Sequence, residues 1–186
     1  MLSLLIVSFL VTSGFEAGGQ VGVLFPASGL ENSHAATALF GVSLAYGTGP
    51  GRYTLTYGYT GLVAKQASPY RFDVHELSVG YGYEFVRHQP APGSTSDWGF
   101  EASAAAGYSL LSRTLVSARE TGKTPAGHVG IGFFQRQGHS RLSLGLDNIV
   151  FIESHTVFTE SQPFGGARVV SLTYLIALKA GVTYVF

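Results

Sequence analysis

Apolar residues alternate with small or polar residues along almost the whole chain, from Phe15 to the last residue, Phe186. Successive side chains of a β-strand point to opposite faces, so this period of two predicts strands rather than helices. The alternation divides into eight segments, near residues 15–25, 36–46, 52–63, 72–85, 98–111, 126–135, 141–151 and 171–186. Eight consecutive strands predict an all-β fold, an eight-stranded antiparallel up-and-down β-barrel, because closure removes both sheet edges.

The pattern fits two kinds of barrel that differ in the direction of the apolar face. A soluble lipocalin-type barrel turns that face inward around a lipid ligand, whereas a transmembrane barrel turns it toward the bilayer. Aromatic residues of the apolar face fall near one end of their strands, as in an interfacial girdle. The predicted girdle consists of Tyr46, Tyr53, Tyr83, Phe85, Trp98, Phe100 and Phe133, with Tyr184 and Phe186 beside them. So many rings would not fit inside a narrow barrel, which favours the transmembrane form.

Charged residues inside the strands support the same orientation. Only 12% of the residues are charged, about half the usual share. All six strand-interior charges that the alternation places lie opposite the aromatic face, as expected if charge is excluded from lipid. These residues are Glu16, Glu76, Glu84, Glu101, Asp147 and Lys179. Lys plus Arg and Asp plus Glu each number 11, so no basic surface indicates a nucleic-acid partner.

The last strand carries a further pattern, an aromatic end preceded by apolar residues at alternate positions. Its members are Leu178, Ala180, Val182, Tyr184 and Phe186. With the eight strands, this pattern resembles the eight-stranded outer-membrane barrels of the OmpA type, over about residues 15–186. The resemblance implies a Gram-negative outer membrane, a signal read by the barrel-assembly machinery, and both termini in the periplasm. It also implies outer loops near 26–35, 64–71, 112–125 and 152–168.

The first 14 residues form a short apolar run that differs from the rest of the chain. The run is shorter than the roughly 20 residues that a spanning helix needs, so we interpret residues 1–14 as the remnant of a signal peptide. The positively charged region that usually precedes such a run is missing. Residues 15–186 form the predicted barrel.

The face opposite the aromatic residues predicts a lumen filled by ion pairs. The predicted network consists of Glu16, Arg52, Glu76, Glu84, Glu101, Arg136, Arg141, Asp147 and Lys179. Side chains can fill a barrel of this width, so we expect a plug, with a narrow porin-like channel as the alternative. Lys179 is expected to meet Asp147, Glu16 or Glu101. Phe134 breaks the alternation, because it falls on the lumen face.

Some small barrels of this kind modify lipid A, so a nucleophile and a base in the lumen are of interest. Ser109, His128 and Glu76 could form an acyl-transfer set, although such residues in a polar lumen are usually only hydrogen-bonded. His34, His75, His128 and His155 lack helix-type ligand spacing, so no metal site is predicted. No cofactor is predicted either.

The sequence therefore predicts a small outer-membrane barrel that is a non-enzymatic structural or interaction protein displaying its outer loops. A channel, a lipid A-modifying enzyme and a soluble lipid-binding barrel are the alternatives. The expected partners are the bilayer and lipopolysaccharide, whose phosphates basic outer-loop residues could contact. Those residues are Lys65, Arg71, Arg113, Arg119, Lys123 and Arg168.

Overall fold

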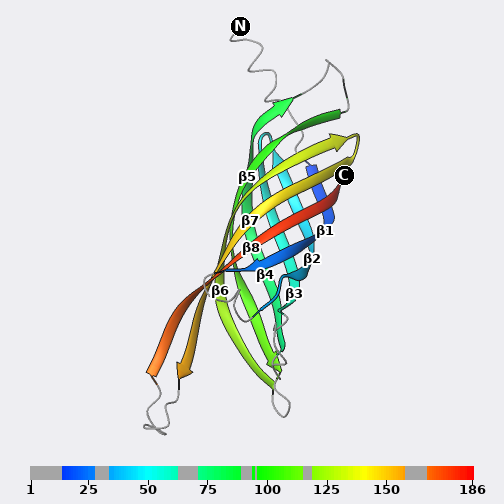
Figure 1. The fold of residues 1–186 in the computed structure, drawn as a ribbon. Coiled ribbons are helices and arrows are strands. Elements are labelled where there is room, and N and C mark those ends of the chain that lie inside the picture. Colours follow the sequence, from blue (N-terminus) through cyan, green and yellow to red (C-terminus); the bar gives the residue numbers. More distant parts are fainter. Residues whose placement is uncertain are drawn as a thin grey trace.

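The chain folds into a closed barrel of eight antiparallel strands (Figure 1). This computed structural model describes residues 14–27, 34–62, 71–88, 94, 96–114, 119–157 and 167–186. The strands are β1 (Gly14–Pro26), β2 (Thr37–Thr48), β3 (Gly51–Leu62), β4 (Arg71–His88), β5 (Ser96–Thr114), β6 (Arg119–Gln137), β7 (Ser140–Val157) and β8 (Ala167–Val185). Each strand pairs with the next one, and β8 returns to pair with β1. The predicted fold class is confirmed. Within the part of the chain that the structure describes, no helix has the length and apolar character needed to cross a bilayer.

The predicted bounds of two outer loops were wrong, because strands extend into both ranges. In place of a loop near 112–125, β5 continues to Thr114 and β6 begins at Arg119. In place of a loop near 152–168, β7 continues to Val157 and β8 begins at Ala167. Backbone pairing continues in both hairpins beyond the segments that alternate. The other two predicted loops lie mostly outside the described residues, as do Lys65 and the predicted signal-peptide residues 1–13.

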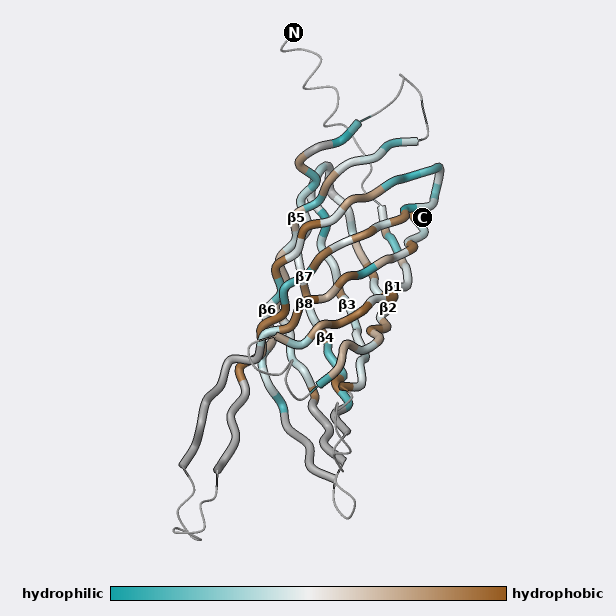
Figure 2. Tube along the Cα trace, viewed as in Figure 1, coloured by the Kyte–Doolittle hydropathy of each residue, from teal (hydrophilic) through white to brown (hydrophobic). Residues whose placement is uncertain are grey.

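The outer surface of the barrel wall is apolar. Large hydrophobic side chains at alternate positions of all eight strands are exposed, including every residue of the predicted aromatic girdle. Figure 2 shows hydrophobic residues recurring along the wall, whereas the turn that joins β6 to β7 is hydrophilic. Girdle rings contact one another, as at Trp98 and Phe133, whose centroids lie 6.1 Å apart. An apolar surface this continuous is the surface that a transmembrane barrel presents to lipid.

Tyrosines also mark the other border of this apolar surface, which the sequence reasoning missed. Tyr57 and Tyr59 on β3 place their hydroxyl groups on the outward face, against His75 and Asp73 of β4. On the opposite side of the barrel the hydroxyl of Tyr174 donates to Asn148. Rings with a polar tip are typical of membrane–water borders. The wall therefore has an aromatic border at both ends.

Glycines allow the first and last strands to approach closely where the barrel closes. A side chain at Gly18 would collide with the Val182 carbonyl oxygen of β8, and one at Gly22 would collide with the Leu178 carbonyl oxygen. At the end of the chain, the Phe186 amide donates to the Phe15 carbonyl over 2.9 Å. The closure of the barrel thus rests on positions that only glycine can occupy without displacing backbone.

Candidate functional site in the barrel lumen

A buried arginine organises the polar lumen near the end of the barrel where β1 begins and β8 ends, the termini of the barrel wall. Arg141 on β7 is 1% exposed. One of its amino groups donates to Glu84 on β4 over 2.6 Å, and the other donates to Glu101 on β5 over 2.8 Å. Its guanidinium carbon lies 4.3 Å from the ring centroid of Phe134, and that of Arg136 lies 5.1 Å from the same centroid. The inward Phe134, which breaks the alternation, is therefore a fully buried surface on which two arginines stack.

Further ion pairs extend this cluster across the lumen. Arg52 on β3 pairs with Glu16 on β1 over 3.0 Å and with Glu101 over 3.3 Å. Arg136 on β6 pairs with Glu84, and its guanidinium also lies 3.8 Å from Asp97. The sequence reasoning missed the pair that Asp97 forms with Arg87, because both residues lie between the predicted strand segments 72–85 and 98–111.

These residues make up the charged plug, which balances four carboxylates against four guanidinium groups. Its members are Glu16, Glu84, Asp97, Glu101, Arg52, Arg87, Arg136 and Arg141. Formal charges therefore cancel within it. A buried charge is tolerated only when it is paired and hydrogen-bonded, so the side chains form one interdependent unit.

A second polar group lies farther along the lumen. Lys179 on β8 donates a hydrogen bond to Asp147 on β7. The Nε2 atom of His128 on β6 is hydrogen-bonded to the carboxyl group of Glu76 on β4. The Nδ1 atom of His128 lies 3.9 Å from an Asp147 carboxylate oxygen, so the four residues form a chain across the barrel. Of the three carboxylates that Lys179 was expected to meet, the structure places it against Asp147.

An apolar cluster fills the lumen at the end opposite the termini. It consists of Leu24, Leu39, Leu62, Val74, Ala126, Ile149, Phe151, Leu175 and Ala177, all of them buried. The sequence reasoning missed this cluster because it assigned the whole inward face to small and polar residues. The sequence does indicate the cluster, because Leu39 and the corresponding residues of other strands lie at positions whose side chains point into the barrel.

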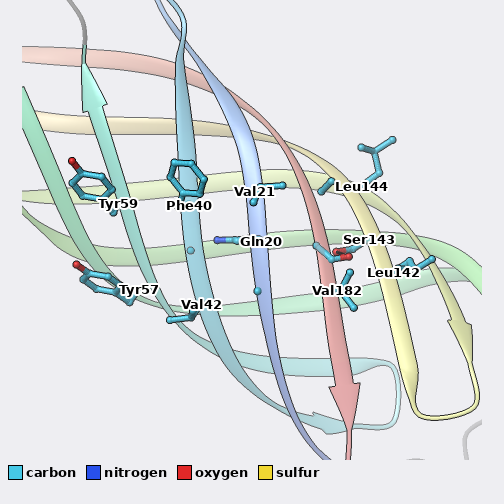
Figure 3. A pocket seen from close by; sticks show the side chains of 14 residues that line it. Gln20, Val21, Phe40, Val42, Tyr57, Tyr59, Leu142, Ser143, Leu144 and Val182 are labelled. Carbon is cyan, nitrogen blue, oxygen red and sulfur yellow. Dashed lines mark hydrogen bonds between the residues drawn. The ribbon is translucent and has the colours of Figure 1, made fainter.

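Two cavities accompany these clusters. One of about 180 Å³ lies in the lumen, and its charged lining includes Arg52, Glu76, Glu101, His128, Asp147 and Lys179. The other, of about 690 Å³, is a groove on the outward face that crosses β8, β1 and β2 (Figure 3). Side chains such as Val21, Phe40 and Leu144 line this groove within the apolar wall. Among the described residues, acidic and basic side chains line the lumen cavity and none lines the groove, so the candidate site is in the lumen.

The predicted acyl-transfer residues are only partly assembled. His128 and Glu76 form a hydrogen-bonded pair. Ser109 is the residue directly opposite Glu76 on the neighbouring strand. However, Ser109 is 1% exposed, and its hydroxyl has no hydrogen-bond partner among the described residues. An acid–histidine pair can hold a base in position, but a buried hydroxyl offers no path for a lipid substrate.

The histidines do not gather at one place. His128 lies in the lumen, whereas His75 lies on the outward face, where its ring meets the Tyr57 hydroxyl at 2.7 Å. The side chain of His155 is outside the described residues. Among the residues that the structure describes, no group of three His, Asp or Glu side chains is placed to hold a metal ion.

The predicted assembly residues lie along the outward face of β8. Leu178, Ala180, Val182, Tyr184 and Phe186 are all exposed there. Phe186 is 73% exposed, and its ring centroid lies 5.1 Å from that of Tyr184. The alternating residues of the closing strand thus form a continuous apolar strip at the junction of the last strand with the first.

Comparison with known proteins identifies the fold. No protein-family model matches the chain, and no curated protein matches it by sequence. Among solved structures, Neisserial surface protein A matches with a TM-score of 0.68 and 16% identity, over 94% of this chain and 98% of that chain. The fold is that of a small outer-membrane β-barrel. The N-terminal barrel domain of Pseudomonas aeruginosa OprF also matches, with a TM-score of 0.50 and 11% identity, over 93% of this chain and 100% of that chain.

A third match extends this fold to another source. A major outer membrane protein from Thermus thermophilus has a TM-score of 0.50 and 10% identity, over 92% of this chain and 99% of that chain. Matches at such low identity establish the architecture of this outer-membrane barrel and leave its activity to be argued from its own side chains.

Proposed function

We propose that the chain is an integral barrel of a Gram-negative outer membrane, and that it acts as a non-enzymatic structural or interaction protein. The observation that carries this proposal is the filled lumen. The charged plug occupies the end with the termini, and the apolar cluster occupies the opposite end. Such a barrel offers no wide path for solutes, so its useful surfaces are the membrane wall and the hairpins beyond it.

The charged plug and the apolar cluster oppose the passage of ions for different physical reasons. An ion that entered the charged plug would have to break paired, buried side chains such as Arg141. An ion at the apolar cluster would lose its hydration and gain no polar partner there. The cavity between them is only about 180 Å³. Together these features support a non-conducting barrel over a narrow channel.

In this proposal both termini lie in the periplasm, and the long hairpins β5–β6 and β7–β8 project outward from the cell (Figure 1). The barrel-assembly machinery would read the strip that ends at Phe186. Lipopolysaccharide phosphates would meet basic residues on the outer hairpins, among them the exposed Lys123. Tyr57 and Tyr174 lie at the corresponding border of the wall.

Three measurements test this function. Accessibility of single cysteines to a membrane-impermeant reagent on whole cells should label a cysteine at Lys123 and leave one at Gly138, in the β6–β7 turn, unlabelled. The purified barrel should pass little current in a planar bilayer, and large steady conductance would instead support the channel. Mass spectrometry of lipid A from cells with and without the protein should show the same acyl pattern.

A lipid A-modifying acyl enzyme is the second candidate, and it rests on one observation. The pair formed by His128 and Glu76 lies beside Ser109, the residue opposite Glu76. If an altered acyl pattern is found, Ser109→Ala should abolish it while the barrel stays folded. An acyl pattern that is unchanged by the protein would eliminate this candidate.

A further inference from the structure

The barrel wall splits between β6 and β7 at the end opposite the termini. Pairing between these strands stops at Ala126 and Phe151. Beyond that point β6 pairs only with β5, down to Arg119, and β7 pairs only with β8, up to Val157. Figure 1 shows the two hairpins diverging there. Both strands therefore have an edge that is unpaired within the described chain, and that of β7 over residues 152–157 is called here the β7 edge.

A proline explains where the split begins. Continuing the register would pair Pro125 with Ile152, and Pro125 has no backbone N–H to donate. The Ile152 carbonyl is instead satisfied by the hydroxyl of Thr124. A side chain thus replaces the last backbone bond, and the ladder ends there.

The same hydrogen bond shows which backbone groups of β7 face the split. Because the Ile152 carbonyl points toward β6, the alternation of an antiparallel strand directs the N–H and C=O groups of Ser154 and Thr156 the same way. Those of Glu153 and His155 point toward β8, with which they are paired. The β7 edge therefore presents a regular row of donors and acceptors.

We propose that the β7 edge binds an extended segment of a partner polypeptide, which adds to the β7–β8 hairpin as a further strand. Only another extended backbone repeats donors and acceptors at the spacing of this row. The facing edge of β6 is less suitable, because it contains Gly122 and ends at Pro125, whereas the β7 edge contains the β-branched Ile152, Thr156 and Val157. The inference rests on the proposed function, in which this hairpin lies outside the cell.

The free edge itself is tested first, by amide hydrogen exchange on the purified barrel in detergent. The amides of Ser154 and Thr156 should exchange much faster than those of Glu153 and His155, which donate within the hairpin. Equal protection at all four amides would mean that the edge is already covered, and the proposal would be wrong.

Binding is tested with a soluble ten-residue peptide that alternates Thr with Lys and Glu, titrated against the same preparation. The Ser154→Pro/Thr156→Pro variant removes two donors from the free side, so its Kd should rise about tenfold or more. The Ser154→Val/Thr156→Val variant keeps both donors and should bind like the parent. In both variants the amides of Glu153 and His155 should stay protected, which shows that the hairpin persists.

Three results of the binding measurements would also overturn the proposal. These are no binding of the peptide to the parent, equal binding by the proline and valine variants, and a parent dimer that the proline variant abolishes, since a dimer would make a second copy the occupant. The assay needs neither an outer membrane nor a closed lumen. A barrel that conducts or that modifies lipid A could still bind the peptide, so failure here is distinct from failure of the proposed function.

Discussion

Replacing Arg141 with Met should destabilise the barrel far more than replacing any arginine at the margin of the charged plug. Arg141 is almost completely buried, with charge-assisted bonds of 2.6 Å to Glu84 and 2.8 Å to Glu101. Removing one partner of a buried pair typically costs about 3–5 kcal/mol, because it leaves an uncompensated charge. Glu84 keeps Arg136 and Glu101 keeps Arg52, so we expect a loss near the lower limit, about 3 kcal/mol.

A conservative change separates charge from geometry at the same position. Arg141→Lys retains the positive charge but cannot bridge both carboxylates or stack on Phe134 as a planar group. We expect it to cost about 1.5–3 kcal/mol, since one charge-assisted hydrogen bond is lost. Arg87→Met is the matched control. The Arg87 side chain is 30% exposed, and its partner Asp97 keeps Arg136 at 3.8 Å, so the loss should stay below about 1 kcal/mol.

The assay is urea unfolding of the barrel reconstituted in lipid vesicles. Trp98 is the only tryptophan of the chain, and it lies in the lipid-facing girdle, so its fluorescence reports withdrawal from the bilayer. Heat-modifiable migration in gels gives an independent measure of the folded fraction. If Arg141→Met costs no more than Arg87→Met, water solvates the carboxylates of the lumen and the plug is not the tightly paired unit inferred here.

Three further predictions concern other parts of the chain. Lys179→Met should lower stability in the same assay, and adding Asp147→Asn should recover most of the loss because no unpaired charge then remains; additive losses would show that the two side chains are uncoupled. Phe186→Asp should leave the chain unassembled in the periplasm, whereas normal heat-modifiable folding in the outer membrane would contradict a role for the terminal ring. N-terminal sequencing of the mature protein should find a start near Phe15, and a start at Met1 on a soluble protein would favour the lipocalin-type barrel.

The alternation was enough to predict that there are eight strands and that the charges inside the predicted segments face the lumen. The parity of Lys179, for example, places it in the lumen without any knowledge of its neighbours. The partner could not be predicted, because it depends on the register. Lys179 is paired with Gly145 of β7, and this brings its ammonium group to Asp147 rather than to Glu16 or Glu101.

The alternation of apolar and polar residues failed to predict two features of the structure for the same physical reason. The alternation reports contact with lipid on one face, and it is silent where that contact is missing. It therefore missed the continuation of β6 from Pro125 to Arg119, where the sequence does not alternate between apolar and polar residues. It also missed the inward cluster around Leu39 and Phe151, because an apolar residue on the inward face does not change the period.

The hydrogen bond between Phe186 and Phe15 suggests that the barrel can be circularly permuted. Since the start of β1 and the end of β8 lie side by side at the closure, a short linker could join Phe186 to Phe15, and new ends could be opened at the β6–β7 turn. Such a circular permutant would keep every strand pair while β6, ending in Gln137, became the last strand to be synthesised. Phe186 would then keep its place in the wall but would no longer lie on the last strand to be synthesised, which would separate its packing in the wall from its proposed role in assembly.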